Sequence, residues 1–355
     1  METGVHHKAQ EASSLWATLR PWLDGLEVVG FAGALILTSL LQARIGHRWV
    51  DIFAQFTAPL FIALVVATVL VGLLRLRKAV WAGFIASLMM FVCAAPQWFP
   101  EPGEPEPGAP VIRLYSANVY YLNDDVAAMR RSIEAANPDI VVLIELGQGA
   151  LGDLDTLLEG YPHRAGSMRL DETRGPSRSI IASRWPLRQV ANRPDGLHSV
   201  TAVAETPLGE VNVVGVHLTR PWPFQYQWGQ ISQTMALGDI RRTLNGPVII
   251  AGDFNSVSNG RIGRQMKEDL GMLPAAGFPG TWPSDLPSPL GMTIDQVWRS
   301  PDLAFLSRRT GRPNGSDHRP VVTEFTRAAR LPGPRGVRRV RRSGNRRRSS
   351  PLRRP

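Results

Sequence analysis

Eight side chains with metal-ligating or proton-transferring groups occur after residue 110 of this 355-residue chain, each close to a short apolar run. They are Asn118, Glu145, His217, Asp253, Asn255, Asp295, Asp317 and His318. Their carboxylate and amide oxygens, with no cysteine among them, suit a hard divalent cation such as Mg²⁺, with Mn²⁺ or Ca²⁺ as alternatives. Such a cation polarises a phosphoryl oxygen, and histidines next to carboxylates hold positive charge against a phosphate. The eight residues therefore indicate metal-assisted phosphoester hydrolysis, provided that the fold brings them together.

The apolar runs beside these residues are typical of buried strands. Residues 140–144 form a continuous apolar run, which is the pattern of a strand covered on both faces. A helix is predicted over 126–136, ending before Asn137-Pro138 because proline breaks a helix. Polar groups at strand ends can converge at one rim of a sheet, where sites are commonly built. The alternation of strands and helices predicts an α/β domain over residues 111–326.

Each of these residues, taken alone, also has a simpler explanation. Glu145 could cap a neighbouring helix, Asp253 follows a glycine as many turn residues do, and Asp317-His318 could form a surface loop. Their order and spacing along the chain, taken together, favour a single site over these separate explanations.

Across residues 111–326, the order of these segments resembles that of the endonuclease/exonuclease/phosphatase superfamily. With the apolar N-terminal segments, the chain resembles a membrane-anchored bacterial member of that superfamily. The matching segments are Ser116-Ala117-Asn118, residues 137–145, Ile181 to Leu187, Val216-His217-Leu218, Ala251-Gly252-Asp253-Phe254-Asn255, residues 293–297 and Ser316-Asp317-His318-Arg319-Pro320-Val321. The resemblance implies a four-layer α/β sandwich, with two mixed β-sheets packed face to face and helices outside. It also implies that the chain is a divalent-metal-dependent phosphoric ester hydrolase.

The resemblance assigns the metal side of the site residue by residue. Glu145 matches the principal metal ligand, with Asn118 beside it, and Asp317 matches a further carboxylate on the metal side. Asp253 matches the residue that orients or deprotonates the attacking water, and Asn255 matches the one that holds this water and the phosphate.

The phosphate side follows in the same way. His318 matches the histidine that binds the scissile phosphate, Asp295 matches the acid that orients it, and His217 matches a second histidine near the phosphate. Arg184, inside a matched segment, is a candidate for binding the substrate. The chain departs from the AP endonucleases at Tyr120, where they carry an aspartate near the metal.

Three apolar segments in the first hundred residues predict a multi-pass membrane region, at about 28–43, 52–74 and 79–99. The second and third are long enough to span, because a helix needs about 20 apolar residues to cross the hydrocarbon core. The first is marginal, with Glu27 and Arg44 at its ends. The alternative is that these segments are core helices of a globular domain.

Charge and proline content predict how this region is oriented and joined to the rest. Arg75, Arg77 and Lys78 lie between the second and third segments, which predicts a cytoplasmic turn and a catalytic domain outside the cytoplasm. Residues 100–110 read PEPGEPEPGAP, which favours a semi-rigid polyproline II linker that lifts the domain clear of the membrane.

The formal net charge of +10 originates at the C-terminus. Residues 327–355 contain twelve arginines and no acid, so residues 1–326 hold 28 basic against 30 acidic side chains, a net charge of −2. This tail is predicted to be disordered. Two roles are open for it: it binds anionic lipid or nucleic acid, or it has no function. The single Cys93 excludes an intramolecular disulfide framework and a cysteine zinc cluster.

The sequence predicts a membrane-tethered nuclease and leaves two alternative functions open. Residues 111–326 hold 21 basic and 22 acidic side chains, so any phosphate-binding patch on the domain must be local. Candidate residues for such a patch are Arg169, Arg174, Arg178 and Arg184. The first alternative is a phospholipid or sphingomyelin-type phosphodiesterase, for which the aromatic stretch 221–228 could contact lipid or simply pack beside the site. The second alternative is a non-catalytic membrane anchor that binds anionic polymers. The expected partners are a phosphodiester substrate and the lipid bilayer, with no protein partner.

Overall fold

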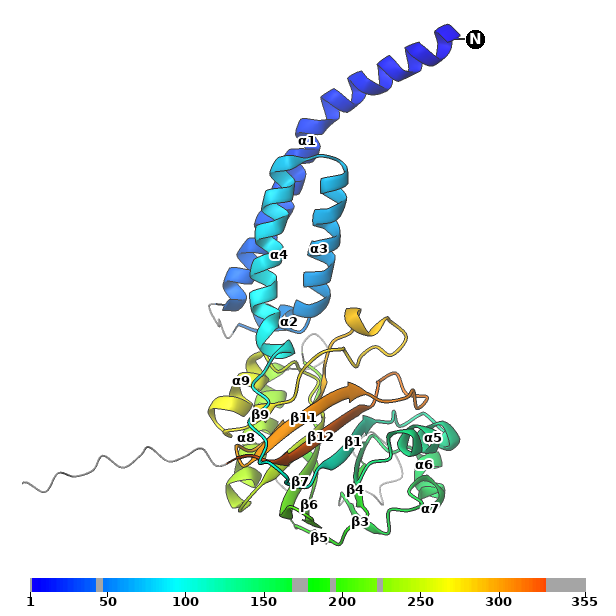
Figure 1. The fold of residues 1–355 in the computed structure, drawn as a ribbon, viewed down its shortest axis with the longest axis vertical. Coiled ribbons are helices and arrows are strands. Elements are labelled where there is room, and N and C mark those ends of the chain that lie inside the picture. The colour runs from blue at the N-terminus through cyan, green and yellow to red at the C-terminus, as the bar shows by residue number, and fades with distance from the viewer. Residues whose placement is uncertain (1, 43–46, 168–177, 192–195, 222–225, 330–355) are drawn as a thin grey trace, which may run out of the picture.

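The computed structural model describes residues 2–42, 47–167, 178–191, 196–221 and 226–329. A helical region comes first and stands on one end of an α/β domain (Figure 1). Its four helices are α1 (Glu2–Gln42), α2 (Arg48–Ala54), α3 (Thr57–Leu73) and α4 (Arg77–Trp98). Helices α3 and α4 form an antiparallel hairpin, and α1 packs along α4.

Two of these helices are long and apolar enough to cross a membrane, and a third span results if the bent pair α2 and α3 is counted as one. The first candidate span covers Leu15–Leu41, 27 residues, and is longer than the predicted 28–43. The helix continues through Glu27 towards its N-terminus, and Arg20 donates a hydrogen bond to the Arg75 carbonyl at the α3–α4 turn. Glu27 lies near the middle of this span, so the helix continues through a charged residue that interrupts the apolar run.

The predicted second segment divides into two helices that meet at an angle of 69°. Helix α3 begins at Thr57, and the preceding residues form the short α2. Polar Asp51 and Gln55 are buried at this break.

The α/β domain consists of two six-stranded mixed sheets with helices packed outside them, which confirms the predicted four-layer sandwich. The first has the order β11-β12-β1-β2-β4-β3, with β11 Leu303–Thr310, β12 Val321–Arg327, β1 Ile112–Asn118, β2 Ile140–Ile144, β4 Ser179–Ser183 and β3 His163–Gly166. The second has the order β5-β6-β7-β8-β10-β9, with β5 Leu187–Gln189, β6 His198–Thr206, β7 Gly209–His217, β8 Val248–Asp253, β10 Asp295–Arg299 and β9 Leu273–Pro274. Only β1–β2 and β7–β8 are parallel pairs among the described ladders.

Helices cover the outer face of each sheet, and an apolar core lies between the sheets. Helices α5 (Val126–Ala136), α6 (Gln148–Gly152) and α7 (Leu154–Leu157) pack on the first sheet, and α8 (Gln227–Thr243) and α9 (Arg261–Glu268) on the second. The continuous apolar run of β2 is explained by burial of both its faces. Val142 faces the other sheet, and Val141 faces the helices.

The proline-rich segment 100–110 lies against the domain, which differs from the predicted spacer. The Pro102 carbonyl accepts from the Phe305 amide, and Glu106 donates to the Arg327 carbonyl. Residues 100–110 thus pair with backbone groups at the edge of the first sheet. Because this segment lies along the domain, it does not act as a spacer between the domain and the helices. The sheet also reaches past the predicted boundary at 326, since Ala328 bridges Pro105. The tail from residue 330 lies outside the described residues.

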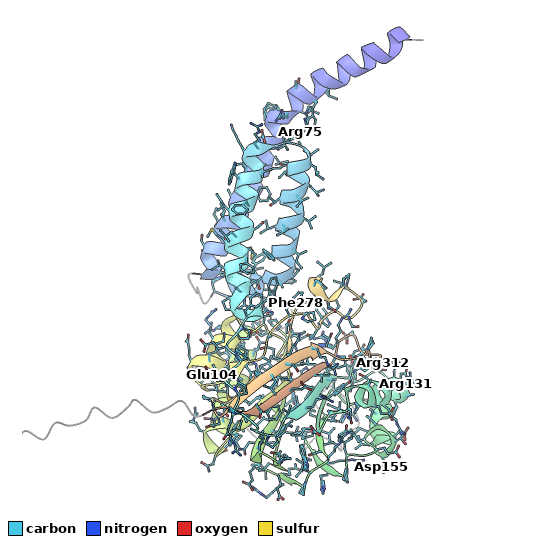
Figure 2. The ribbon with its side chains drawn as sticks, viewed as in Figure 1. Arg75, Glu104, Arg131, Asp155, Phe278 and Arg312 are labelled. Atoms are coloured by element: carbon cyan, nitrogen blue, oxygen red, sulfur yellow. The ribbon has the colours of Figure 1, made fainter. Side chains whose placement is uncertain are left out.

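The helical region contacts the domain directly. Gly277 donates to the Gln97 carbonyl at 2.7 Å, and the Asn259 amide donates to the Cys93 carbonyl at 2.9 Å. The Trp98 and Phe278 rings are 5.4 Å apart, and Phe278 marks the junction in Figure 2. The domain is therefore held at the end of α4.

Gly215 provides a test of the sheet packing. A Cβ here would lie 2.9 Å from Val200 Cγ1 and 3.0 Å from Val142 Cγ1, between the two sheets. Gly215→Val is expected to lower the free energy of unfolding by about 1–3 kcal/mol through overpacking, measured by urea denaturation of the full chain. Gly152→Ala is the control, because its Cβ would meet no heavy atom within 4 Å. Equal stability of the two variants would contradict this packing.

Candidate active site

One edge of the domain gathers the ends of five strands. Strands β1 and β2 are parallel and end at this edge with Asn118 and Glu145. Strands β7 and β8 also end here, where His217 pairs with Asp253 in the ladder. Strand β10 is antiparallel to β8 and begins here, with Asp295 opposite Asp253. The two sheets thus bring side chains from distant parts of the sequence to one place.

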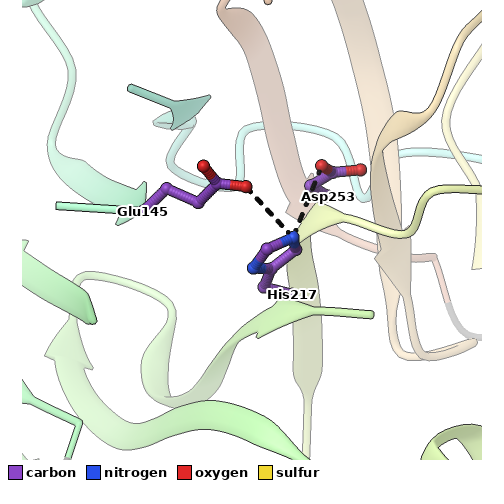
Figure 3. Close-up of side chains that lie close together, drawn as sticks. All are labelled: Glu145, His217 and Asp253. Atoms are coloured by element: carbon purple, nitrogen blue, oxygen red, sulfur yellow. Dashed lines mark ion pairs between the residues drawn. The ribbon is translucent and has the colours of Figure 1, made fainter. Parts of the chain in front are cut away.

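Glu145, His217 and Asp253 form the first group at this edge (Figure 3). His217 Nε2 lies 3.2 Å from Glu145 Oε1 and 3.8 Å from Asp253 Oδ2. The Asn118 amide donates to Glu145 Oε1 at 3.0 Å and to Asp253 Oδ2 at 3.1 Å. One ligand atom from each of the three titratable residues lies within 4.8 Å of the others, and all three are buried.

This group fits a divalent cation. Buried carboxylates need compensating charge, and carboxylate oxygens with an imidazole nitrogen are ligands for such ions. The Asn118 oxygen accepts from the Tyr120 amide at 3.0 Å, so Asn118 would have to turn its amide to ligate an ion. Asp317 lies outside the group, since its carboxylate accepts from the Trp282 indole at 3.2 Å. Of the predicted metal ligands, the structure brings Asn118 and Glu145 together and leaves Asp317 at the rim.

Asp253, Asp295 and His318 form the second group. His318 Nδ1 lies 2.9 Å from Asp295 Oδ2, and its Nε2 lies 4.0 Å from Asp253 Oδ2. Burial alone would lower the pKa of His318, but the charge and hydrogen bond of Asp295 outweigh it and raise that pKa to about 10. Burial raises the pKa of Asp253 to about 6, with Asp295 adding to the rise and His318 opposing it. His318 is therefore positively charged at neutral pH.

Left-handed backbone is found at three non-glycine residues of this edge: Tyr120, Glu145 and Asn255, with φ of 60°, 59° and 46°. Such conformations cost energy and cluster at functional sites. The Asn255 amide donates to Asp253 Oδ1 at 2.8 Å, and its side chain donates to the Leu218 carbonyl at 2.9 Å. Asn255 thus fixes the orientation of the Asp253 carboxylate.

A cavity of about 370 Å³ opens beside these groups. Its lining includes Glu145, Asp253, Asn255, Asp317 and His318 from the predicted site, together with Arg220, Pro221, Trp282, Met292 and Ile294. The remaining lining residues are Ile52, Gln55 and Phe56, which come from α2 and its junction with α3. Sequence reasoning missed these three because they lie in a run counted as a membrane span, although a glutamine in such a run is a signal of function.

Arg184, predicted to bind the substrate, is not among the residues that line this cavity. Strand β4 is antiparallel to β2, so the chain after β4 returns to the edge where β2 begins. There the Arg184 guanidinium lies 3.6 Å from Asp139 and stacks 5.6 Å from the centre of the Tyr161 ring. Arg178 lies at the other end of β4, where its carbonyl accepts from Leu146. Arg169 and Arg174 lie outside the described residues.

Comparison with known proteins identifies a family. The model of the Endonuclease/Exonuclease/phosphatase family matches residues 115–318. No curated protein matches the chain.

Solved structures with a TM-score of at least 0.50 show the same fold. The endonuclease/exonuclease/phosphatase from Bacteroides vulgatus is 17% identical, with a TM-score of 0.51, over 61% of this chain and 99% of that one. A functionally unknown conserved protein from Enterococcus faecalis V583 is 12% identical, with a TM-score of 0.50, over 61% and 100% of the two chains. The endonuclease/exonuclease/phosphatase from Beutenbergia cavernae DSM 12333 is 20% identical, with a TM-score of 0.49, over 61% and 72%.

Asp295→Asn tests the electrostatics of the second group. Removal of the Asp295 charge leaves burial to dominate, so the pKa of His318 is expected to fall below about 10. If protonated His318 is required, the alkaline limb of the pH–rate profile moves to lower pH, and the rate at neutral pH falls by about 10²-fold or more. The measurement is hydrolysis of bis(p-nitrophenyl) phosphate by the full chain between pH 6 and 10. An unchanged alkaline limb would show that Asp295 does not set the charge of His318.

Proposed function

The chain belongs to the endonuclease/exonuclease/phosphatase family, and from this premise we propose that it is a membrane-anchored, divalent-metal-dependent phosphodiesterase whose substrate is a phospholipid-like molecule. The observation that supports this substrate is the shared cavity, which Phe56 of the helical region lines together with Asp253 and His318. The acidic and histidine groups therefore share one cavity with a side chain of the helical region.

The position of the helices supports a cavity at the level of the lipid head groups. The hairpin of α3 and α4 extends away from the domain, and Arg75 at its turn lies at the far end (Figure 2). The domain end of the hairpin then marks one membrane surface. Helix α2 lies at this end with Trp49 and Phe53 partly exposed, and aromatic residues are enriched at membrane interfaces.

The chemistry of the cavity favours an amphiphilic substrate. Its acidic and histidine groups suit a phosphodiester with a bound cation, while Phe56, Met292 and Ile294 offer apolar surface. Arg220 is the one basic side chain, apart from His318, among the described residues that line the cavity. A nucleic acid makes several phosphate contacts and needs several basic residues along its path. The nuclease hypothesis stays a prediction, with less support than the lipid substrate.

In this proposal Glu145 would hold the cation, Asn118 would join it after its side-chain amide turns, and His217 lies beside them. Mg²⁺ is the expected ion, and Mn²⁺ or Ca²⁺ are alternatives. The bound ion supplies Lewis-acid polarisation of a phosphoryl oxygen and stabilises the leaving group.

The other groups act on water and phosphate. Asp253 orients the attacking water and accepts its proton, for which a pKa of about 6 is suited near neutral pH. His318 holds the negative charge of the phosphate, and Asp295 fixes its ring through the 2.9 Å contact. Asn255 holds both the water and the Asp253 carboxylate. Asp317 at the rim acts on the metal side only if the loop that carries it moves inward.

Lipid and nucleic-acid substrates are separated by one assay of the full chain in proteoliposomes with Mg²⁺ or Mn²⁺. Phospholipids, sphingomyelin, single- and double-stranded DNA, and RNA are offered in parallel. We expect lipid hydrolysis that EDTA abolishes and that Asp253→Asn lowers by about 10³-fold. Asp239→Asn is the matched control, since this aspartate is exposed on α8 and pairs with Arg242.

The other outcomes each favour a different function. Cleavage of DNA or RNA without lipid turnover would sink the lipid proposal and favour the nuclease. Absence of any phosphoester hydrolysis by the folded protein would favour the non-catalytic anchor.

We also propose that the catalytic domain lies outside the cytoplasm of a multi-pass membrane protein. Arg75, Arg77 and Lys78 are at the hairpin end far from the domain, and basic loops stay in the cytoplasm. Alkaline phosphatase fused after Pro355 is expected to be active, and a green fluorescent protein fused there is expected to be dark. A fluorescent fusion with an inactive phosphatase would place the domain in the cytoplasm.

A further inference from the structure

Three glutamines hold the loop that follows β8 and carries Asn255. Gln230 of α8 donates to the Phe254 and Asn255 carbonyls at 2.9 and 3.0 Å. Gln296 of β10 donates to the Ser256 carbonyl. Gln55 accepts from the Val257 amide at 2.8 Å and donates to Ser256 Oγ at 3.4 Å. The backbone of four consecutive loop residues is thus bound by side chains from outside the loop.

Gln55 differs from the other two glutamines because it belongs to the helical membrane region. It is 4% exposed and lies between α2 and α3, about 200 residues before the loop in the sequence. One turn earlier, Asp51 accepts from the Arg261 amide at 2.6 Å, where α9 begins, and from the Gln227 side chain at 2.6 Å. Helix α2 and its junction therefore hold both ends of the segment between β8 and α9.

The loop needs this support because Asn255 has left-handed backbone, with φ of 46°. A strained conformation persists only where the surroundings over-determine it. The Asn255 amide in turn orients the Asp253 carboxylate at 2.8 Å. A shift of the loop would therefore displace both residues, and a displacement of about 1 Å at a reacting group can cost about 10²-fold in rate.

We infer that Gln55 is a positioning residue of the active site, through which the membrane anchor holds the Asn255 loop in its reactive conformation. The inference rests on the proposed function only in taking Asp253 and Asn255 as groups that act on the phosphate. The competing explanation is that Gln55 merely attaches the anchor to the domain.

The test compares two buried glutamines of the helical region in the full chain, purified in detergent. Gln55→Met keeps the length of the side chain and removes its hydrogen bonds to the loop. Gln97→Met is the matched control, because Gln97 is 1% exposed at the same junction and its side chain contacts Thr57 and not the loop. Gln55→Glu keeps the acceptor for the Val257 amide. Bis(p-nitrophenyl) phosphate is the substrate, with Mn²⁺ present and the unfolding temperature of each variant recorded.

We expect Gln55→Met to lower kcat by about 10-fold or more with a small change in KM, and Gln55→Glu to recover part of the loss. Gln97→Met should keep kcat within about threefold at a similar unfolding temperature. Equal losses in Gln55→Met and Gln97→Met, or an unchanged kcat in Gln55→Met, would overturn the inference. If Gln55→Met does not fold, Gln55→Glu decides: a kcat below that of Gln97→Met supports positioning, and a kcat equal to it overturns it.

The same measurements separate this inference from the substrate proposal. Turnover of the model diester without turnover of any lipid would refute the lipid substrate and leave the role of Gln55 testable. Lipid turnover with no effect of the Gln55 variants would refute the positioning role alone.

Discussion

Three buried carboxylates lie at one edge of the domain, and their negative charge has to be compensated there. Glu145, Asp253 and Asp295 come from β2, β8 and β10 and are each almost fully enclosed. Positive charge comes from His318, whose pKa is raised by its contact with Asp295, and the remaining charge is suited to a divalent cation. These like-charged groups stay close together because the surrounding structure holds them in place. The sheet pairings, the residues with left-handed backbone and the contacts to the Asn255 loop all contribute.

The anchor contributes to the same arrangement. Gln55 and Phe56 lie where the N-terminal helices meet the domain, and both line the cavity that contains Asp253. The proline-rich segment 100–110 is paired along the first sheet, so the helices and the domain stand against each other. The helical region therefore forms part of the cavity wall as well as contacting the domain.

Much of the site could be predicted because it depends on local patterns. Glu145, His217 and Asp253 follow buried strands directly, and parallel pairing takes such residues to a common edge. Other features depend on contacts that one sequence does not encode locally. Arg184 belongs to a matched segment, but antiparallel pairing of β4 carries it to the opposite edge. Hydropathy indicated one apolar run through Gln55 and did not indicate the break between α2 and α3. The proline content of residues 100–110 did not indicate which backbone groups of the domain they would pair with.

The wall that Phe56 and its neighbours form has a kinetic consequence. For the proposed membrane-anchored lipid phosphodiesterase, a substrate that reaches the cavity along this wall would move within the bilayer, so encounters would occur by lateral diffusion in two dimensions. The turnover of such an enzyme depends on the mole fraction of substrate in the membrane and not on its concentration in the surrounding solution. Addition of inert lipid would then slow the reaction by dilution within the surface, even at a constant total amount of substrate.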